Sequence, residues 1–329
     1  MVKLFCQIII RRPASIYKMF INKPKFWNNS GFSFWSIVLY PISILYLLFF
    51  QIKKIKNSKK YKIPIICIGN IYLGGTGKTP LALEIFNICK SLGKKPAFVK
   101  KYYSYLDDEI NLLKKKGMVF TLKNRNDAVE SLINNNNDTA ILDDGFQDFG
   151  FKKDLSIICF SEKQWIGNGM IIPSGPLREG LSGIKRADCI IINGKKNIKI
   201  EQELYNQNKN IEIYYSIYRP LDIDKFKNKK IVAFAGIGNP VNFFDLLEKE
   251  KLNLLNKFSF PDHYKYTNKD LEKLISYSKK SDSTLLTTEK DYYRIDDNYK
   301  EKVEFIKVEI EIENKNNFIN LIKKSYEKN

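Results

Sequence analysis

The sequence predicts an α/β protein with a phosphate-binding loop in its first half and a second, smaller α/β unit after it. Three observations support this prediction. A glycine-rich segment at 69–80 stands between a short apolar run and an apolar helical pattern. Further short apolar runs end in acidic or polar residues, as buried strands of a parallel sheet do. The 329 residues are enough for about two domains of ~100–200 residues each.

The composition limits the classes of function. The net charge is +19 and 44% of the residues are hydrophobic, which suffices for buried cores. A basic surface suits nucleic acid, anionic lipid or a phosphorylated substrate. No compact basic stripe alternates with aromatic residues, so nucleic acid is the least favoured partner. The five cysteines are odd in number and have no C-x-x-C spacing, which predicts buried thiols without a disulfide framework or a metal site.

The N-terminal part contains a hydrophobic segment, residues 31–52, that carries no charge and is followed by a cluster of lysines. It reaches the ~20 residues that a membrane-spanning helix needs. Aromatic residues gather at its beginning, as at a membrane interface. Three interpretations remain open: a helix in the membrane interface, a full span, or a buried core helix. The lysines would face anionic lipid on the cytoplasmic side.

The phosphate loop is predicted from the order of strand, glycine-rich turn, Lys-Thr and helix. Residues 62–68 have the pattern of a buried strand, and 81–89 that of a helix with Pro80 in its first turn. Backbone N–H groups and the helix N-terminus would bind phosphate oxygens. Lys78 would reach the β- and γ-phosphates, and the Thr79 hydroxyl would bind Mg²⁺.

The loop departs from the G-x-x-x-x-G-K-[ST] pattern, which has glycine where this chain has Tyr72. Gly74 and Gly75 are expected to form the tight turn instead. The alternative is a structural turn that precedes Lys-Thr by chance. The residues expected to bind the nucleotide are Tyr72, Leu73, Gly74, Gly75, Thr76, Gly77, Lys78 and Thr79.

Acidic residues follow the next two predicted strands, 96–100 and 139–142. Asp108 and Glu109 precede a helix, where carboxylates commonly cap the helix N-terminus. Asp143 and Asp144 follow an apolar strand directly, which is the Walker B arrangement. Ligands of open parallel sheets bind at the carboxyl ends of the strands. Asp143 and Asp144 are therefore expected to lie within reach of Mg²⁺, with an Asx-type turn as the alternative.

Two further features lie in the second half of the chain. Arg178 lies in a rigid turn that contains Pro-Ser-Gly-Pro, between the predicted strands 155–160 and 189–192. Its planar, permanently charged guanidinium is a candidate phosphate clamp. His263, the only histidine, lies in a turn beside Asp262. On this evidence a structural role and proton transfer are equally open for His263.

Two segments with alternating apolar residues, 211–217 and 303–312, are predicted to pair as antiparallel strands. Between them lies a compact α/β unit. Its elements are a strand at 231–235, a helix at 241–251 and a strand at 285–291 that ends in charged residues.

The motifs together resemble the tetraacyldisaccharide 4'-kinase family, the lipid A 4'-kinases of Gram-negative bacteria. The matching segments occur in the family's order and cover nearly the whole chain; they are 69–70 with 74–80, 108–109, 143–147, 173–179, 186–188, 235–240 with 243–244, 260–263 and 288–291. The loop containing Tyr72 is similar to the family's own. The chain departs at Asp148, where the family usually has histidine, at 100–103, which replace a Ser-Arg-Gly-Tyr segment, and in a short loop before Asp108.

The resemblance implies a kinase that transfers the γ-phosphate of ATP to the 4'-hydroxyl of a tetraacylated glucosamine disaccharide 1-phosphate, giving lipid IV-A. It implies two α/β/α domains joined by a two-stranded linker. The expected division is a hydrophobic membrane-associated segment at 1–60, an ATP-binding kinase domain at 61–210, a linker of 211–220 with 303–312, a second domain at 221–302 and a C-terminal helix at 313–329.

A four-chain lipid acceptor has a negligible concentration in water, so the enzyme is expected to work at the cytoplasmic face of the inner membrane. ATP and Mg²⁺ are the expected cofactors, with no nucleic acid and no obligate protein partner. Asp108 and His263 are expected to abstract the proton after the domains close over ATP, and Lys78 to assist catalysis. Glu109 and Gln147, which stand in matching segments, are expected to contact the substrate.

Two other classes of protein remain as alternatives: a membrane-tethered P-loop ATPase switch and a basic nucleic-acid-binding ATPase. The isolated His263 and the Asp108–Glu109 pair favour a site that deprotonates an acceptor hydroxyl, which a switch does not need.

Overall fold

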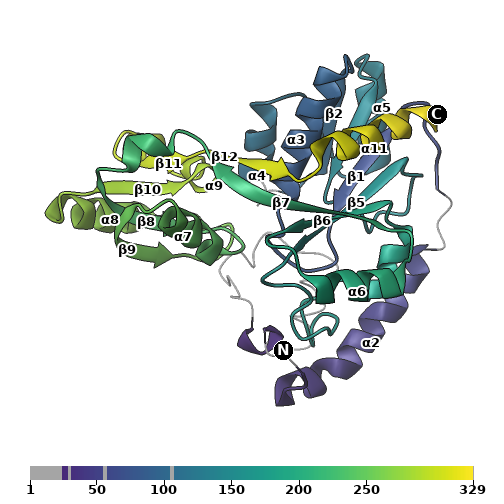
Figure 1. The fold of residues 1–329 in the computed structure, drawn as a ribbon, viewed down its shortest axis with the longest axis horizontal. Helices are drawn as coiled ribbons and strands as arrows, with labels where there is room; N and C mark the ends of the chain where they lie inside the picture. The colour runs from purple at the N-terminus through teal and green to yellow at the C-terminus, as the bar shows by residue number, and fades with distance from the viewer. Residues whose placement is uncertain (1–23, 29–30, 55–57, 104–106, 329) are drawn as a thin grey trace.

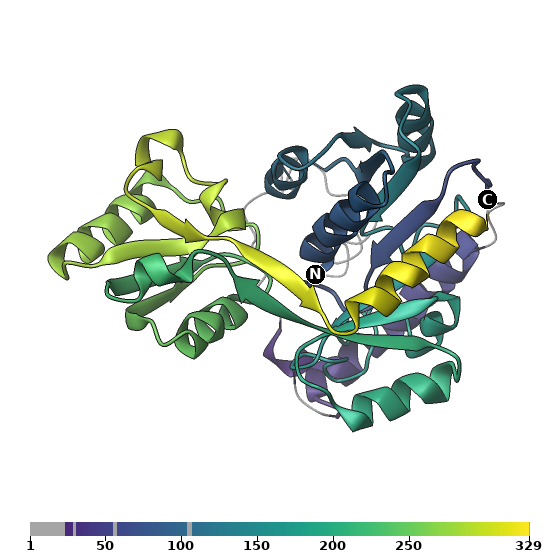
Figure 2. The ribbon, with the colours of Figure 1, turned by 45° about the horizontal axis from the view of Figure 1, so that its top comes forward.

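The computed structural model describes residues 24–28, 31–54, 58–103 and 107–328. The described chain forms two α/β units, each built on a largely parallel sheet, and two long strands bridge them (Figures 1 and 2). The α/β fold class predicted from the sequence is confirmed.

The larger sheet has eight strands in the order β12-β7-β6-β5-β1-β4-β2-β3. The strands are β1 (Ile65–Gly69), β2 (Pro96–Lys101), β3 (Val119–Leu122), β4 (Thr139–Asp143), β5 (Leu155–Ser161), β6 (Cys189–Asn193), β7 (Glu212–Pro220) and β12 (Val308–Ile312). Only β12 is antiparallel to its neighbour. Because β1 lies between β4 and β5, the glycine-rich loop and the Asp143 carboxylate emerge at the same edge of the sheet.

Helices cover both faces of the larger sheet (Figure 1). One face packs against α3 (Lys78–Ser91), α4 (Asp107–Lys114) and α11 (Lys315–Glu327). The other packs against α5 (Arg125–Asn134) and α6 (Ile198–Gln207). β1, β4 and β5 are buried along their whole length, which explains their continuous apolar sequences. Four cysteines are buried free thiols, as predicted, and Cys6 lies outside the described residues.

The smaller unit has four parallel strands in the order β11-β10-β8-β9. The strands are β8 (Lys230–Ala235), β9 (Asn253–Ser259), β10 (Thr284–Thr288) and β11 (Glu304–Ile306). Its helices are η4 (Ile223–Phe226), α7 (Pro240–Lys249), α8 (Asn268–Lys280), α9 (Glu289–Tyr292) and α10 (Asp297–Lys300). α7 and α8 pack against separate apolar clusters on the sheet's two faces.

The bridge between the units corrects one prediction. The segment 303–312 is two strands: β11 pairs with β10 in the smaller sheet, whereas β12 pairs antiparallel with β7. β7 in turn pairs with β6 up to Ser216, so only its last four residues form a free two-stranded ribbon with β12. The alternating pattern did not reveal this division, because a strand pairs in either sheet with the same period of two.

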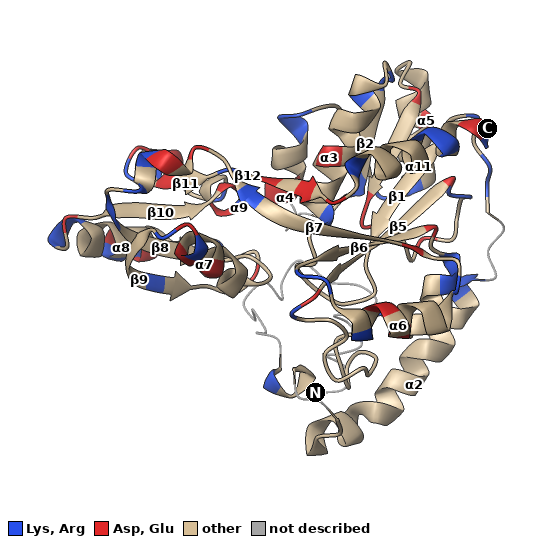
Figure 3. Ribbon diagram, in the orientation of Figure 1, with Lys and Arg blue, Asp and Glu red and all other residues tan. Residues whose placement is uncertain are grey.

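The hydrophobic segment forms α2 (Phe34–Lys54), which lies along the larger unit (Figure 1). Its buried residues include two serines, Ser36 and Ser43, whereas most of its large apolar side chains are exposed. Only 17% of its apolar stretch is buried inside the protein, so the interpretation as a buried core helix is wrong. By length and composition α2 could cross a membrane. Figure 3 shows that its charged residues are confined to its C-terminal end.

α2 is fastened to the larger unit by hydrogen bonds as well as by packing. The Ser43 hydroxyl donates to the carbonyl of Ile171 at 2.9 Å and contacts the Ser174 hydroxyl at 2.9 Å. In the short helix η2 (Lys25–Trp27), the buried Trp27 indole donates to the carbonyl of Pro173 at 3.0 Å. Polar contacts therefore face the protein, and the apolar surface faces outward.

Candidate active site

The glycine-rich loop between β1 and α3 folds around the side chain of Asn70. The Asn70 amide donates to the carbonyls of Tyr72 at 2.5 Å and Gly74 at 3.1 Å, and to the Thr76 hydroxyl at 3.1 Å. These bonds fix the shape of the loop from within. The Tyr72 side chain is 1% exposed and packs in the core, so Tyr72 contributes only its backbone to the surface of the loop.

Gly77 is the position in the loop that most requires glycine. Its φ is +93°, and an added Cβ would lie 2.2 Å from the Asn193 amide nitrogen and 2.5 Å from the Tyr218 hydroxyl. Asn193, at the end of β6, donates to the carbonyl of Thr76 at 2.5 Å. The neighbouring strands therefore support the loop from behind and leave the α3 N-terminus open to a phosphate.

Asp143 lies at the end of β4 and meets the first turn of α3. Its Oδ2 accepts from the Thr79 hydroxyl at 3.2 Å and from the Lys100 ammonium at 2.5 Å. Its Oδ1 is buried and has no hydrogen-bond partner among the described residues. A buried carboxylate oxygen beside a threonine hydroxyl is suited to a cation.

Asp144 is held by the two cations predicted to bind phosphate. Arg178 donates to both of its carboxylate oxygens, at 2.7 and 3.2 Å, and the Lys78 ammonium lies 3.8 Å away. Burial raises the pKa of the Asp144 carboxyl, but Arg178 and Lys78 hold it well below its usual range. Arg125 donates to the Asp144 carbonyl at 2.7 Å and pairs with Asp148 at 3.1 Å.

Asp108 extends from the first turn of α4 to the smaller unit. Its Oδ1 lies 3.3 Å from His263 Nδ1, and its Oδ2 accepts from Arg294 Nε at 2.9 Å and also from Arg294 Nη2. Burial raises the pKa of Asp108, but the His263 hydrogen bond and the charges of Lys290 and Arg294 keep it well below its usual range. The described contacts of this carboxylate thus join the two units instead of capping α4.

Glu109 continues this network of charges. It pairs with Lys100 at 2.6 Å and with Lys290 at 2.8 Å, and His263 Nε2 lies 3.8 Å away. Burial raises the pKa of Glu109, but Lys100 and Lys290 hold it well below its usual range. Burial also lowers the pKa of Lys100, yet the Asp143 and Glu109 carboxylates raise it above its ordinary value. Lys100 thus connects the Asp143 carboxylate at the end of β4 with the Glu109 carboxylate on α4.

The tip of the loop touches the smaller unit. A Cβ on Gly238 would lie 2.7 Å from the Gly75 nitrogen, so the two backbones are in direct contact. The turn that contains Gly238 leads into α7, and Asp291 accepts from the Gly236 N–H at 3.1 Å. The two units are therefore closed over the end of the phosphate loop in this structure.

This arrangement can be compared with known proteins. The model of the family described as tetraacyldisaccharide-1-P 4'-kinase (LpxK) matches residues 35–105 and 100–327. The tetraacyldisaccharide 4'-kinase of Pelagibacter ubique is 40% identical over 94% of this chain and 100% of the relative. The chain belongs to the tetraacyldisaccharide 4'-kinase family. It is a lipid kinase with 4'-kinase activity in lipid A biosynthesis.

Other relatives agree with this assignment. The tetraacyldisaccharide 4'-kinase of Rickettsia bellii is 34% identical over 83% of this chain and 89% of its own length. A crystal structure of LpxK from Aquifex aeolicus, described as an apo form in complex with ATP, has a TM-score of 0.69 at 22% identity. It covers 88% of this chain and 99% of that one, and this likeness establishes the fold.

Several charged residues of this kinase site were not singled out from the sequence. They are Lys100, Arg125, Lys290 and Arg294. Lys100 gives the clearest signal, because it is a lysine at the end of an otherwise apolar strand, and it is only 2% exposed. Lys290 and Arg294 stand four residues apart around the short helix α9, a spacing that puts both side chains on one side of a helix.

Gln147, expected to contact the substrate, makes its described contacts within the protein. Its amide donates to the Asn70 carbonyl at 2.9 Å and to Glu179 Oε1 at 3.0 Å, and its Oε1 accepts from Arg178 at 3.4 Å. It therefore links the base of the phosphate loop with Arg178 and with the buried Glu179.

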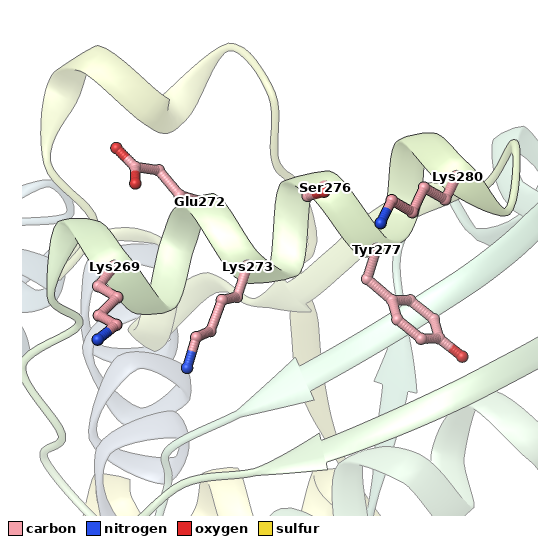
Figure 4. A pocket seen from close by; sticks show the side chains of 6 residues that line it. All are labelled: Lys269, Glu272, Lys273, Ser276, Tyr277 and Lys280. Atoms are coloured by element: carbon pink, nitrogen blue, oxygen red, sulfur yellow. The ribbon is translucent and has the colours of Figure 1, made fainter.

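A shallow hollow of about 370 Å³ lies elsewhere, along one helix of the smaller unit. Figure 4 shows its lining on α8, which consists of Lys269, Glu272, Lys273, Ser276, Tyr277 and Lys280. No residue of the phosphate loop or of the acidic network contributes to it, so it does not belong to the kinase site.

Proposed function

We propose that this chain transfers the γ-phosphoryl group of ATP to the 4'-hydroxyl of a tetraacyldisaccharide 1-phosphate, where the phosphate loop meets the smaller unit. The observation that carries the proposal is the contact between Asp108 and His263, beside a loop built for phosphate. The pair brings together a carboxylate and an imidazole from different units, and with ATP bound to the loop it would lie beside the γ-phosphate. A hydroxyl acceptor between them could be both oriented and deprotonated.

The nucleotide would be held by loop N–H groups, the α3 N-terminus and two cations. Lys78 and Arg178 both approach the Asp144 carboxylate, so their positive charges lie close together. The phosphates of ATP would compete with Asp144 for these cations. Because the transition state of phosphoryl transfer spreads negative charge over oxygens, cations fixed in this way contribute through electrostatics and positioning.

The described residues fit a bound Mg²⁺. This ion takes oxygen ligands, retains several waters and is bound by one or two carboxylates together with phosphates. Thr79 and Asp143 would bind it, because Asp143 Oδ1 has no described partner. Asp144 has both oxygens on Arg178 and is better suited to positioning the cations than to binding the metal. The ion would supply charge neutralisation on the phosphoryl oxygens.

Asp108 would accept the proton of the acceptor hydroxyl, and His263 would orient the carboxylate. The depressed pKa of Asp108 keeps it ionised near neutral pH, ready to accept a proton. It also makes Asp108 a weak base, which a loose phosphoryl-transfer transition state tolerates because positioning does most of the catalysis. Glu109 would hold Lys100 and Lys290 in place around the pair.

The reaction would occur at the cytoplasmic face of the inner membrane, with α2 lying in the membrane interface. Apolar side chains such as Trp35, Leu45 and Phe49 are more than half exposed on this helix, while its serines face the protein. An exposed apolar face of this size is characteristic of a membrane contact. Because α2 is fastened along the larger unit through Ser43, an interfacial position fits better than a free span.

The proposal is tested by measuring ATP consumption with and without tetraacyldisaccharide 1-phosphate in detergent micelles. We expect transfer to the lipid, detected as a product with an added phosphate, and little hydrolysis without it. An acceptor already phosphorylated at the 4' position is the matched control and should give no turnover. Equal ATP consumption with and without lipid would instead support a membrane-tethered ATPase switch.

A further inference from the structure

A cavity separate from the phosphate loop lies at the C-terminal end of α2. It has a volume of about 290 Å³, and its lining includes Lys54, Phe146, Phe149, Lys153, Ser156 and Arg186. These residues come from the end of α2, the segment between β4 and β5, the start of β5 and the end of the short helix η3 (Leu181–Arg186). We call it the α2-end cavity.

The charges around the α2-end cavity are predominantly positive. Lys54, Lys153 and Arg186 contribute three cations, and the one carboxylate in the lining, Asp148, is paired with Arg125. Lys153 donates to the carbonyl of Phe146 at 2.6 Å and forms no ion pair with a described carboxylate. Burial lowers the pKa of Lys153. The Cys67 thiol and the Asp148 carboxylate oppose this shift, whereas the positive charges of Arg186 and Arg125 add to it. A partly buried cation of this kind is stabilised by an anion.

Arg186 is held in a fixed orientation beside Lys153. Its Nη2 donates to both carboxylate oxygens of Glu179, at 2.9 and 2.7 Å. Its guanidinium lies 4.8 Å from the ring centre of Phe146 and 5.2 Å from that of Phe149. A planar guanidinium fixed by a carboxylate and two rings is pre-organised to bind phosphate oxygens.

The position of the cavity indicates that the anion belongs to a lipid. Phe149 packs edge-on against Phe50 of α2, with the ring centres 5.8 Å apart, and Lys54 is the last residue of that helix. The cavity therefore opens where the exposed apolar surface of α2 ends and its basic end begins. Lipid phosphates lie at this level of a bilayer, and basic pockets beside membrane helices bind them.

The cavity is also connected to the kinase site. Arg186 binds Glu179, Glu179 accepts from Gln147, and Gln147 accepts from Arg178, which holds Asp144. We propose that the α2-end cavity binds the phosphate group of a membrane lipid. The phosphate is either the 1-phosphate of the acceptor or the headgroup phosphate of an anionic phospholipid. In the first case the inference rests on the proposed function, and in the second case it does not.

The test uses Lys153→Gln, with Lys152→Gln as the matched control. Lys152 is the exposed neighbour outside the cavity lining, and the two variants lose the same charge. In the first arm, KM is measured in detergent micelles for tetraacyldisaccharide 1-phosphate and for the same acceptor without its 1-phosphate. Loss of one charge-assisted contact should raise KM for the phosphorylated acceptor about tenfold or more. KM for the other acceptor should stay unchanged.

In the second arm, the full chain is sedimented with phosphatidylcholine vesicles that contain or lack phosphatidylglycerol. If the phosphate is that of a phospholipid, Lys153→Gln should lose binding to the anionic vesicles, while Lys152→Gln keeps it. A selective loss in the first arm assigns the cavity to the acceptor, and one in the second arm assigns it to phospholipid. If wild type fails to phosphorylate the acceptor, the proposed function fails and the vesicle arm alone decides the inference.

The inference is overturned if Lys153→Gln behaves like Lys152→Gln in both arms. Thermal unfolding of each variant shows whether it is folded. Should Lys153→Gln not fold, the same two arms are run with Lys54→Gln, for which the exposed neighbour Lys53→Gln is the control. Lys153→Arg keeps the charge, so it is expected to behave like wild type in whichever arm Lys153→Gln fails.

Discussion

At the scale of single residues, the site is defined by how buried charges are paired across the two units. Three residues of the smaller unit contact Asp108: His263 by a hydrogen bond, and Lys290 and Arg294 by ion pairs. Such pairs contribute through geometry, because each buried charge needs its partner to offset the cost of leaving water. Removing one partner should therefore affect catalysis more than its distance from ATP suggests.

The first prediction concerns Asp108 and His263. Asp108→Ala and His263→Ala should each lower kcat by roughly 10²–10⁴-fold, the usual range for a lost general base, with little change in the KM for ATP. The double variant should be hardly slower than the slower single variant, because the two groups act as a unit. Steady-state kinetics of the three variants test this. Additive losses in kcat would leave His263 with a purely structural role.

A second prediction concerns Arg294, whose charge helps to depress the pKa of Asp108. Arg294→Met should raise the pKa of Asp108, so protonation of this carboxylate would begin at a higher pH. The acid limb of the pH profile of kcat should then move upward by about one pH unit or more. Arg294→Lys, which keeps the charge, should move it less. An unshifted acid limb in Arg294→Met would show that Asp108 does not control it.

At the scale of elements, α2 differs from the other helices because its apolar face lies outside the protein. The helices of the two sheets bury their apolar residues against strands, whereas the buried residues of α2 are Ser36, Ser43 and Phe50, and most of its large apolar side chains are exposed. The described part of the chain leaves this apolar face in water. Contact with another surface would remove it from water and gain the corresponding free energy. Under the proposed function a lipid bilayer would be that surface, since the acceptor is itself an acylated lipid.

The third prediction tests this face. Leu45→Glu and Leu48→Glu replace side chains that are 56% and 58% exposed, so the fold should be unaffected. Each should weaken binding to lipid vesicles at least about tenfold, because a carboxylate is costly to place among acyl chains. Tyr277→Glu, on an exposed position of α8, is the control. Unchanged vesicle sedimentation of the α2 variants would exclude this face as the membrane contact.

At the scale of the whole molecule, two units share one site but are joined by a narrow ribbon. Beyond Ser216, β7 pairs only with β12, so the bridge has two strands where the larger sheet has eight. A two-stranded ribbon twists and bends more easily than a sheet covered by helices. Opening and closing of the units is thus expected to occur there, with the Gly75–Gly238 contact made only in the closed state.

The fourth prediction concerns that contact. Gly238→Ala would place a Cβ 2.7 Å from the Gly75 nitrogen and so hold the units apart. Because catalytic groups of both units must align, kcat should fall about 10²-fold, while ATP binding to the larger unit should be retained. Gly180→Ala, whose Cβ would meet nothing closer than 3.8 Å, is the control. Wild-type kcat in Gly238→Ala would show that full closure is not needed.

The local features of this protein follow from short stretches of its sequence. Glycines, a Lys-Thr pair and flanking apolar runs specify a phosphate loop, because their effect on the backbone is local. The Asp143–Asp144 pair at a strand end was predictable for the same reason. Apolar periodicity likewise indicated most of the strands.

Which distant residues meet depends on how the strands are ordered and how the two units pack. Asp108 and His263 are 155 positions apart, and only the closed arrangement of the two units brings them within 3.3 Å. Lys100 could not be assigned to Asp143 without the strand order that sets β2 beside β4. The sequence likewise left three interpretations for the segment that forms α2. Composition fixes how apolar a segment is, but contacts with distant parts of the chain determine which of its faces is covered.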